Sequence, residues 1–307
     1  MDTSFSFSDA VQKFQNLLEF RNLAHSTQEN YLKWLKRFFQ WVDADSPSLL
    51  LPSHAFDFIL HLHTDCRYSD SYINQASASL RLFYPAILDI QVTGQQIPIR
   101  HVRRKPARWF SHEDVLRILD SCRDHDPLLF TCIALAYECG LRASEVVNIQ
   151  LGDIDPVRST IYIRGSKRNK SRLVHYSPAL RQILNSYCAS QRLTRSGYPS
   201  DSFIFHAKRP DVPYNRGTIS RRFKDHIRAL GYQEGFCFHS LRHSYATTLA
   251  LRNVSIFAIK TSMGHKSVQT TENYIHLPSD LHLTWSTPLS EEETSPLNGD
   301  MVNKDGR

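Results

Sequence analysis

The sequence predicts a mainly α-helical protein with a small β-sheet, divided into two domains of ordinary size. Three observations predict this class. The chain has 307 residues, which is enough for two domains that each bury a core. Roughly the first 95 residues carry apolar side chains at helical spacing, whereas two short β-type runs appear only after residue 159. A basic break that contains two prolines separates the two regions.

Helices are predicted throughout the N-terminal region, 1–97, which we interpret as a small helical bundle. Ser26 and Glu29 have the spacing of a capping box, and aromatic residues follow them at helical intervals as far as Trp41. The other three helices are indicated by Phe14, Leu17, Leu18 and Phe20 and by the stretches 55–62 and 72–88. The aromatic face is interpreted as the core of the bundle.

Residues 98–108 are predicted to form a basic linker. Pro98 and Pro106 disfavour regular structure, and no acidic residue balances the cations. The cations of this segment are Arg100, Arg103, Arg104, Lys105 and Arg108. The alternative is a surface loop beside an acidic patch of the same protein.

The region 109–277 is predicted as a mixed domain. Ser111 caps a helix with acidic residues in its first turn, and an apolar helix runs from Pro127 to about Tyr137. Two β-type runs, 160–164 and 172–176, flank a cation-rich turn. Helical patterns resume at 178–192, 215–230, 240–252 and 255–263 and around Tyr274. The tail, 278–307, starts apolar, becomes acidic and is predicted to be disordered.

The charge distribution favours a partner that is a polyanion. The net charge of +7 divides into −3 over 1–95, +5 over 96–110, +9 over 111–277 and −4 in the tail. The alternative is a basic enzyme with scattered surface charge. No apolar run reaches 18 residues, which argues against a membrane protein. The start does not resemble a secretory signal, and the six cysteines include no CxxC pair, which argues against a secreted mini-domain and a zinc finger. A cytoplasmic location is expected.

A set of separated residues could form one reactive site. Its members are Arg142 and Glu145 after Gly140, His239 with Arg242, His265 after Gly264, Tyr274, and a lysine of the cation-rich turn. Two arginines can each donate a pair of hydrogen bonds to one phosphate, and cations favour the tyrosine anion that attacks phosphorus. No carboxylate pair for two metal ions accompanies them, so no metal and no cofactor is expected. A metal site of His239, His243 and His265 is the alternative, but it lacks the glutamate of a zincin.

These motifs, in this order, resemble the tyrosine recombinases of the phage integrase family in their compact Xer-type layout. The resemblance implies an N-terminal SAM-like core-binding domain, a catalytic domain and a metal-independent site-specific recombinase. It makes Tyr274 the nucleophile that forms a 3′-phosphotyrosyl link, and it makes Arg142 and Arg242 the phosphate clamp. His239 and His265 would bind the phosphate and move protons, Glu145 would support the site, and Lys167 would protonate the leaving oxygen. The turn departs from the family's Gly-Lys-Gly pattern, so Lys170 stays open as the catalytic lysine.

The resemblance also implies the partners. Double-stranded DNA with inverted-repeat half-sites would be bound by a homotetramer, formed from free monomers or dimers. Cations of the linker, with Arg168 and Lys170, are expected to contact DNA. The alternatives are a catalytically silent DNA-binding protein on the same scaffold and a type IB-like topoisomerase. The apolar start of the tail is expected to dock on a neighbouring protomer, and the alternative is that it folds back on its own domain.

Overall fold

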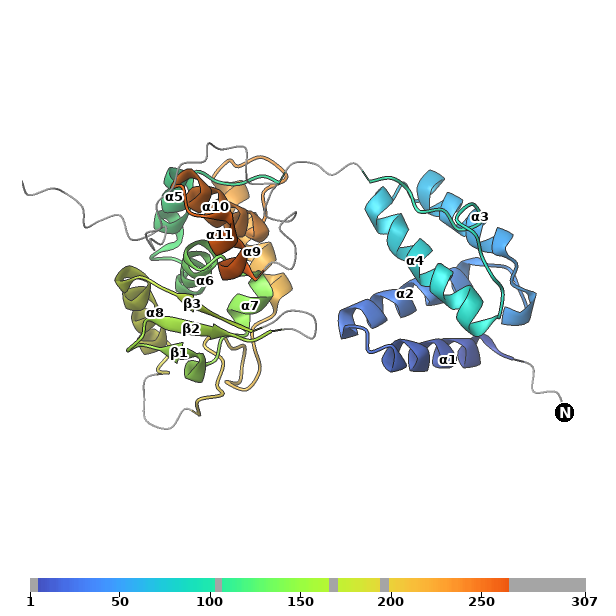
Figure 1. Cartoon of the computed structure of the whole chain (residues 1–307), viewed down its shortest axis with the longest axis horizontal. Coiled ribbons are helices and arrows are strands. Elements are labelled where there is room, and N and C mark those ends of the chain that lie inside the picture. The colour runs from blue at the N-terminus through green and yellow to red at the C-terminus, as the bar shows by residue number, and fades with distance from the viewer. Residues whose placement is uncertain (1–4, 103–106, 166–170, 194–198, 265–307) are drawn as a thin grey trace, which may run out of the picture. The chain divides into compact units, whose positions relative to one another are not determined.

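The computed structural model describes residues 5–102, 107–165, 171–193 and 199–264. Within it the chain divides into two compact units, Met1–Lys105 (unit 1) and a second that begins at Pro106 (unit 2) (Figure 1). Unit 1 is helical, and unit 2 combines helices with a small three-stranded sheet. The predicted fold class is therefore confirmed.

Over residues 5–102, unit 1 contains four α-helices and one short 3₁₀ turn. These elements are α1 (Phe7–Phe20), α2 (His25–Trp41), η1 (Pro47–Leu49), α3 (Pro52–Thr64) and α4 (Asp70–Ile87). The predicted cap of α2 is wrong, because the helix already begins at His25 after Ala24, which makes no side-chain cap. Asn22 adopts a left-handed φ of 49°, so the chain turns sharply after α1 and the next helix starts before Ser26 is reached.

Aromatic side chains form the core of unit 1, as their helical spacing predicted. Phe14 meets Phe83 edge to face at 5.6 Å between ring centroids, and Phe38 lies 5.3 Å from Phe58. All four rings are buried. The aromatic face of α2 therefore holds α1, α3 and α4 together.

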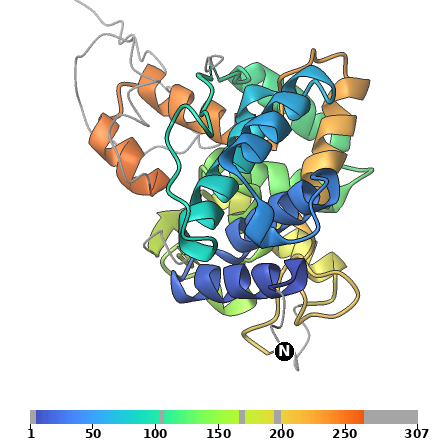
Figure 2. The ribbon, with the colours of Figure 1, turned by 90° about the vertical axis from the view of Figure 1, so that its right-hand side faces the viewer.

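The segment that follows α4 folds back along this helix (Figure 2). Ser77 donates a hydrogen bond to the carbonyl of Pro98, at 2.8 Å, and Arg81 donates one to the carbonyl of Ile97, at 2.7 Å. The Asn74 amide both donates to and accepts from the Arg100 backbone, at 2.9 and 2.8 Å. The first residues of the predicted linker are thus attached to unit 1.

Unit 2 contains seven helices, a 3₁₀ turn and three strands among its described residues. The helices are α5 (His112–Cys122), α6 (Pro127–Glu138), α7 (Ala143–Val147), α8 (Pro178–Ser190), α9 (Arg216–Ala229), α10 (Phe238–Leu251) and α11 (Ile256–Met263), and the 3₁₀ turn is η2 (Leu151–Asp153). The strands are β1 (Ile154–Asp155), β2 (Thr160–Ile163) and β3 (Arg172–His175). They form an antiparallel sheet in the order β1-β2-β3, in which Ile163 pairs with Arg172.

The predicted elements of unit 2 up to α11 are found, and three short ones, α7, η2 and β1, were missed. The helix predicted around Tyr274 lies outside the described residues. The Ser111 hydroxyl accepts from the Asp114 amide at 3.0 Å and caps α5, as expected. Helix α7 and strand β1 have five and two residues, which is too short for a periodic pattern. Within the described ranges, no helix combines the length and apolar content that a bilayer span requires.

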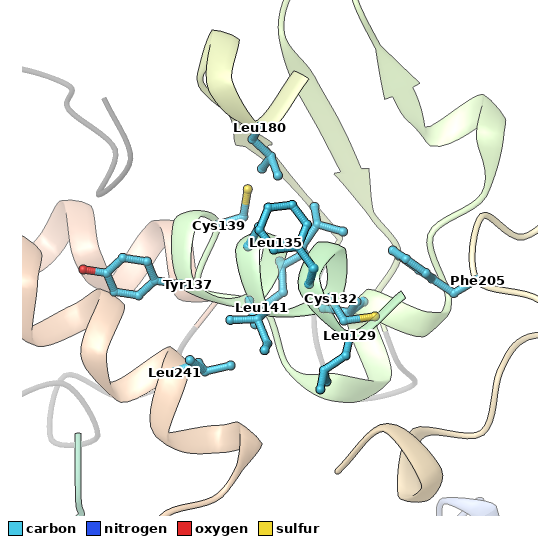
Figure 3. Close-up of a cluster of buried hydrophobic side chains, with 14 of the residues drawn as sticks. Leu129, Cys132, Leu135, Tyr137, Cys139, Leu141, Leu180, Phe205 and Leu241 are labelled. Carbon is cyan, nitrogen blue, oxygen red and sulfur yellow. The ribbon is translucent and has the colours of Figure 1, made fainter. Parts of the chain in front are cut away.

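Helix α6 lies at the centre of unit 2. It is apolar on all sides, which is typical of a helix buried all round. Its buried side chains lie in one cluster with Leu180 of α8, Leu241 of α10 and Phe205, which approach α6 from different sides (Figure 3). This central helix fixes the position of the turn that follows its C-terminus, where the candidate site begins.

Candidate active site

The turn after α6 positions Arg142. Gly140 has a φ of 61°, in the left-handed region that favours glycine. A Cβ atom there would lie 2.6 Å from Cδ1 of Tyr245, so the close approach to α10 also requires glycine. The chain then enters α7, with Arg142 at the N-cap and Glu145 in the first turn.

Glu145 is the centre of a cluster of arginines. Its carboxylate accepts hydrogen bonds from Nη1 of Arg142, at 2.8 Å, and from the Arg142 amide, at 3.0 Å. It lies 3.7 Å from Nη1 of Arg242 on α10. Burial would raise the pKa of Glu145, but hydrogen bonds from Arg172 and the charges of the arginines lower it to about 2. The carboxylate is therefore ionised at neutral pH.

Arg172, the first residue of β3, was not singled out in the sequence. Its Nη1 and Nη2 each donate to one oxygen of Glu145, both at 3.0 Å, and its Nε donates to the carbonyl of Ser262, at 2.7 Å. The side chain is only 10% exposed. The alternation of side chains along the strand could have indicated its burial. Arg172 lies two residues before Val174, so both side chains lie on the same face of β3, and Val174 is buried.

Arg242 is fully buried and connects α10 to two other segments. It donates to the carbonyl of Gly140, just before Arg142, and to the carbonyl of Met263 at the end of α11. Gly264 ends α11 with a φ of 63°, as the sequence predicted. Two arginines, Arg172 and Arg242, thus bind the last carbonyls of α11.

His239 stands at the second residue of α10, exposed to solvent at the edge of the cluster. Partial desolvation lowers the pKa of His239, and the charges of Arg242 and Arg142 lower it further, against the opposite effect of Glu145. The neutral imidazole is therefore favoured at neutral pH. Such a ring can accept a proton at one nitrogen while it donates a hydrogen bond from the other.

The described residues contain no set of ligands for the alternative metal site of His239, His243 and His265. His239 and His243 meet edge to face, with ring centroids 4.7 Å apart. No group of three or more His, Cys, Asp or Glu side chains gathers there or elsewhere in the described part of the chain. The third residue of that alternative, His265, lies outside the described residues.

Other predicted site residues also lie outside the described ranges. They are Lys167, Arg168, Lys170, His265, Tyr274, Arg103, Arg104 and Lys105. The predicted docking of the tail concerns 278–307, which lies outside as well. The described part places the pairs Arg142 with Glu145 and His239 with Arg242 in one cluster. The assignments of all these residues stay predictions.

The two linker arginines that the structure describes are engaged within separate units. Arg100 forms an ion pair with Asp70 in unit 1, and its Nη2 lies 3.4 Å from Nε2 of His63. In unit 2 the guanidinium of Arg108 lies over the ring of Phe236, 5.5 Å from its centroid. Arg100 is thus paired within unit 1 and Arg108 is exposed beside Phe236 in unit 2, and their contact with DNA stays a prediction.

The chain is similar in sequence to known proteins. Residues 108–280 match the phage integrase family, and residues 11–93 match its N-terminal SAM-like domain. The tyrosine recombinase XerA of Thermococcus kodakarensis is 26% identical over 271 residues, which cover 87% of this chain and 90% of that protein.

Solved structures have the same fold. The Tn1549 transposon integrase in complex with transposon right end DNA matches with a TM-score of 0.68 at 15% identity, over 88% of this chain and 95% of that one. A lambda integrase tetramer bound to a Holliday junction matches with a TM-score of 0.68 at 16% identity, over 92% and 81%. Because the family match spans more than half of the chain and the ordered motifs agree with it, the protein belongs to the phage integrase family and is a tyrosine recombinase.

Proposed function

We propose that this protein cuts and rejoins the strands of double-stranded DNA through a covalent 3′-phosphotyrosyl intermediate, with Tyr274 as the nucleophile. The observation that carries the proposal is the cluster around Glu145. It gathers three arginines from distant parts of the chain onto one carboxylate, which leaves an excess of positive charge beside His239. Such a site attracts a phosphodiester and stabilises the charge that develops on it.

Each described residue of the cluster has a separate role in this mechanism. Arg142, whose side chain is 30% exposed, donates to a non-bridging oxygen of the scissile phosphate. Arg242, expected from the resemblance as its partner in the clamp, is 1% exposed in the DNA-free protein, where it binds the carbonyl of Gly140 beside Arg142. His239 accepts or donates a hydrogen bond at the same phosphate, and its lowered pKa keeps the imidazole neutral, so that one ring nitrogen can accept a proton. Glu145 holds the arginines and does not react, because its own pKa is too low for a base.

Helix α9 extends the proposed DNA-binding surface beyond the site. It packs against α7, which carries Glu145. Arg221, Lys224 and Arg228 are exposed at positions that share one face of α9. Arg216 adds a further exposed cation at the helix start. We infer that this face contacts phosphates on either side of the cleaved bond, which explains part of the excess charge of this domain.

The partners follow from the same proposal. Recombination joins two DNA sites, so we infer that four copies of the chain assemble on two sites built from inverted-repeat half-sites. A lambda integrase with the same fold has been solved as a tetramer bound to a Holliday junction. A type IB-like topoisomerase would release a relaxed circle without exchanging strands, and a silent DNA-binding protein would form no adduct at all.

The phenolic oxygen of Tyr274 is the atom to test. A nicked suicide duplex carrying the inverted-repeat site traps the covalent intermediate, which is detected on a denaturing gel in excess EDTA. The wild-type chain should form the adduct, and Tyr274→Phe should bind the duplex equally well and form none, because only the nucleophilic oxygen is lost. An adduct that persists in Tyr274→Phe would refute the assignment, and activity that Mg²⁺ restores after EDTA would refute metal independence.

A further inference from the structure

A single guanidinium connects three elements of unit 2 beneath the candidate site. Arg172 of β3 binds both oxygens of Glu145 on α7 and the carbonyl of Ser262 in the last turn of α11. A Cβ atom on Gly264 would lie 3.3 Å from Cδ and Nη1 of Arg172, so the chain leaves α11 directly against this side chain. Because Arg172 is almost fully buried, DNA cannot reach its guanidinium as it reaches Arg142.

The hydrogen bonds of Glu145 show what Arg172 does for Arg142. A carboxylate offers about four lone-pair sites, and the fork of Arg172 occupies one on each oxygen. Arg142 then retains one side-chain bond to Glu145, at 2.8 Å, and keeps part of its guanidinium exposed. Without Arg172, the ionised Glu145 would attract both donor edges of Arg142 and hold it away from a phosphate.

The same side chain fixes the end of α11. The carbonyls of the last helical turn lack partners within the helix and carry partial negative charge. Arg172 binds the Ser262 carbonyl, and Arg242 binds that of Met263. These two bonds set the direction in which the backbone enters the left-handed Gly264.

We propose that Arg172 is a positioning residue of the reaction. It neutralises Glu145 so that Arg142 stays available to the phosphate, and it anchors the end of α11 beside the site. Its effect on rate rests on the proposed function, whereas its effect on the availability of Arg142 does not. A purely structural role would lower stability without changing how Glu145 divides its bonds between the two arginines.

The first test measures the rate of covalent adduct formation on the suicide duplex. Arg172→Met should slow it on the order of 10²-fold, the size expected when a phosphate-binding group is displaced, with little change in duplex binding. Arg172→Lys should be intermediate, since it keeps the charge but loses the fork. The double variant Arg172→Met with Glu145→Gln should be faster than Arg172→Met alone, because the carboxylate that captures Arg142 has been removed.

Arg164→Met is the matched control. Arg164 follows β2 in the same β-hairpin, but its guanidinium pairs with Asp153, at 2.9 Å, rather than with Glu145. The variant should retain the wild-type rate. If the double variant is as slow as Arg172→Met or slower while its thermal unfolding is unchanged, the proposal is overturned.

The second test needs no activity. Phenylglyoxal modifies accessible guanidinium groups, and peptide mass spectrometry gives the rate at Arg142 in the DNA-free protein, with the highly exposed Arg158 as internal reference. Arg142 should react several-fold more slowly in Arg172→Met, and the Glu145→Gln double variant should restore the rate. Equal rates at Arg142 in wild type and Arg172→Met would overturn the proposal. If the labelling changes as expected but the wild type forms no adduct, the proposed function fails and the role of Arg172 stands.

Discussion

At the residue scale, the proton donor to the leaving 5′-oxygen is the least constrained assignment. Lys167 and Lys170 both lie in the sequence between β2 and β3. The pair of residues next to this segment is Ile163, at the end of β2, and Arg172, at the start of β3. Position in the sequence therefore does not distinguish the two lysines, and a chemical test must separate them.

We expect Lys167→Ala to cleave ordinary DNA slowly and to be largely rescued when sulfur replaces the leaving 5′-oxygen. Sulfur is a better leaving group and needs no proton from a general acid. Cleavage rates of both substrates by Lys167→Ala and Lys170→Ala, under single-turnover conditions, decide between the residues. Rescue of Lys170→Ala alone would mean that Lys170 is the general acid.

His243 gives the folded protein a dependence on pH. Burial lowers the pKa of His243 to about 4, with further lowering by the charges of His239 and Arg242. In the unfolded chain the ordinary pKa is near 6.5, so the unfolded state binds more protons between these values. The free energy of unfolding should therefore fall as the pH drops from about 6.5 to about 4.

His243→Gln should make this fall shallower, by up to about 3 kcal/mol at the acidic end, because the residue that takes up the proton on unfolding is gone. Urea unfolding of both proteins at several pH values between 4.5 and 7.5 measures the difference. Parallel curves for the two proteins would show that another group is responsible.

At the scale of elements, the turn between α6 and α7 determines where Arg142 stands. Gly140→Ala introduces a Cβ 2.6 Å from the Tyr245 ring and a side chain at a φ of 61°. We expect a loss of about 1–3 kcal/mol in the free energy of unfolding and slower adduct formation, since the turn must shift. Gly231→Ala is the matched control, with a φ of 84° and open space around its Cβ.

The denaturant midpoints of the two glycine variants distinguish the cost of a left-handed backbone from the cost of steric overlap with Tyr245. Gly231→Ala reports the cost of the left-handed backbone alone, and the excess loss in Gly140→Ala reports the collision with Tyr245. If both variants lose the same stability and cleave alike, the close approach of α10 does not constrain the turn.

At the scale of the whole molecule, binding to DNA should depend on the cations of the predicted linker. Asp70 already neutralises Arg100, whereas Arg103, Arg104 and Lys105 follow without an acidic residue among them. Replacing these three by glutamine should weaken binding to all duplexes. It should also reduce the slope of log K against log salt by up to about 0.9 for each phosphate that is no longer neutralised.

Arg100→Gln should leave the slope nearly unchanged, because its charge is already paired. Fluorescence anisotropy with specific and random duplexes, over a series of salt concentrations, measures both variants. An unchanged slope in the triple variant would mean that this segment lies away from DNA.

Local signals in the sequence were sufficient for most of the fold. Helix limits, the cap at Ser111, the hairpin strands and the glycine that ends α11 depend on neighbours within four or five residues, which a periodic pattern records. The cap assigned to Ser26 failed because the turn at Asn22 decides where α2 begins. The order of Arg142, His239, Arg242, His265 and Tyr274 was sufficient to recognise the family.

Only the tertiary structure decided how the site residues are connected. That Glu145 binds Arg172, that Arg242 is buried against Gly140 and Met263, and that Arg100 is paired with Asp70 are contacts between elements distant in sequence. No spacing rule encodes them, because in unit 2 they depend on how α6, α10 and β3 pack, and in unit 1 on how the segment after α4 folds back along that helix. The sequence by itself therefore determined which residue types are available to a phosphate under the proposed function. Packing determined which arginine remains exposed, since a buried carboxylate must be neutralised by the cations that its neighbours present.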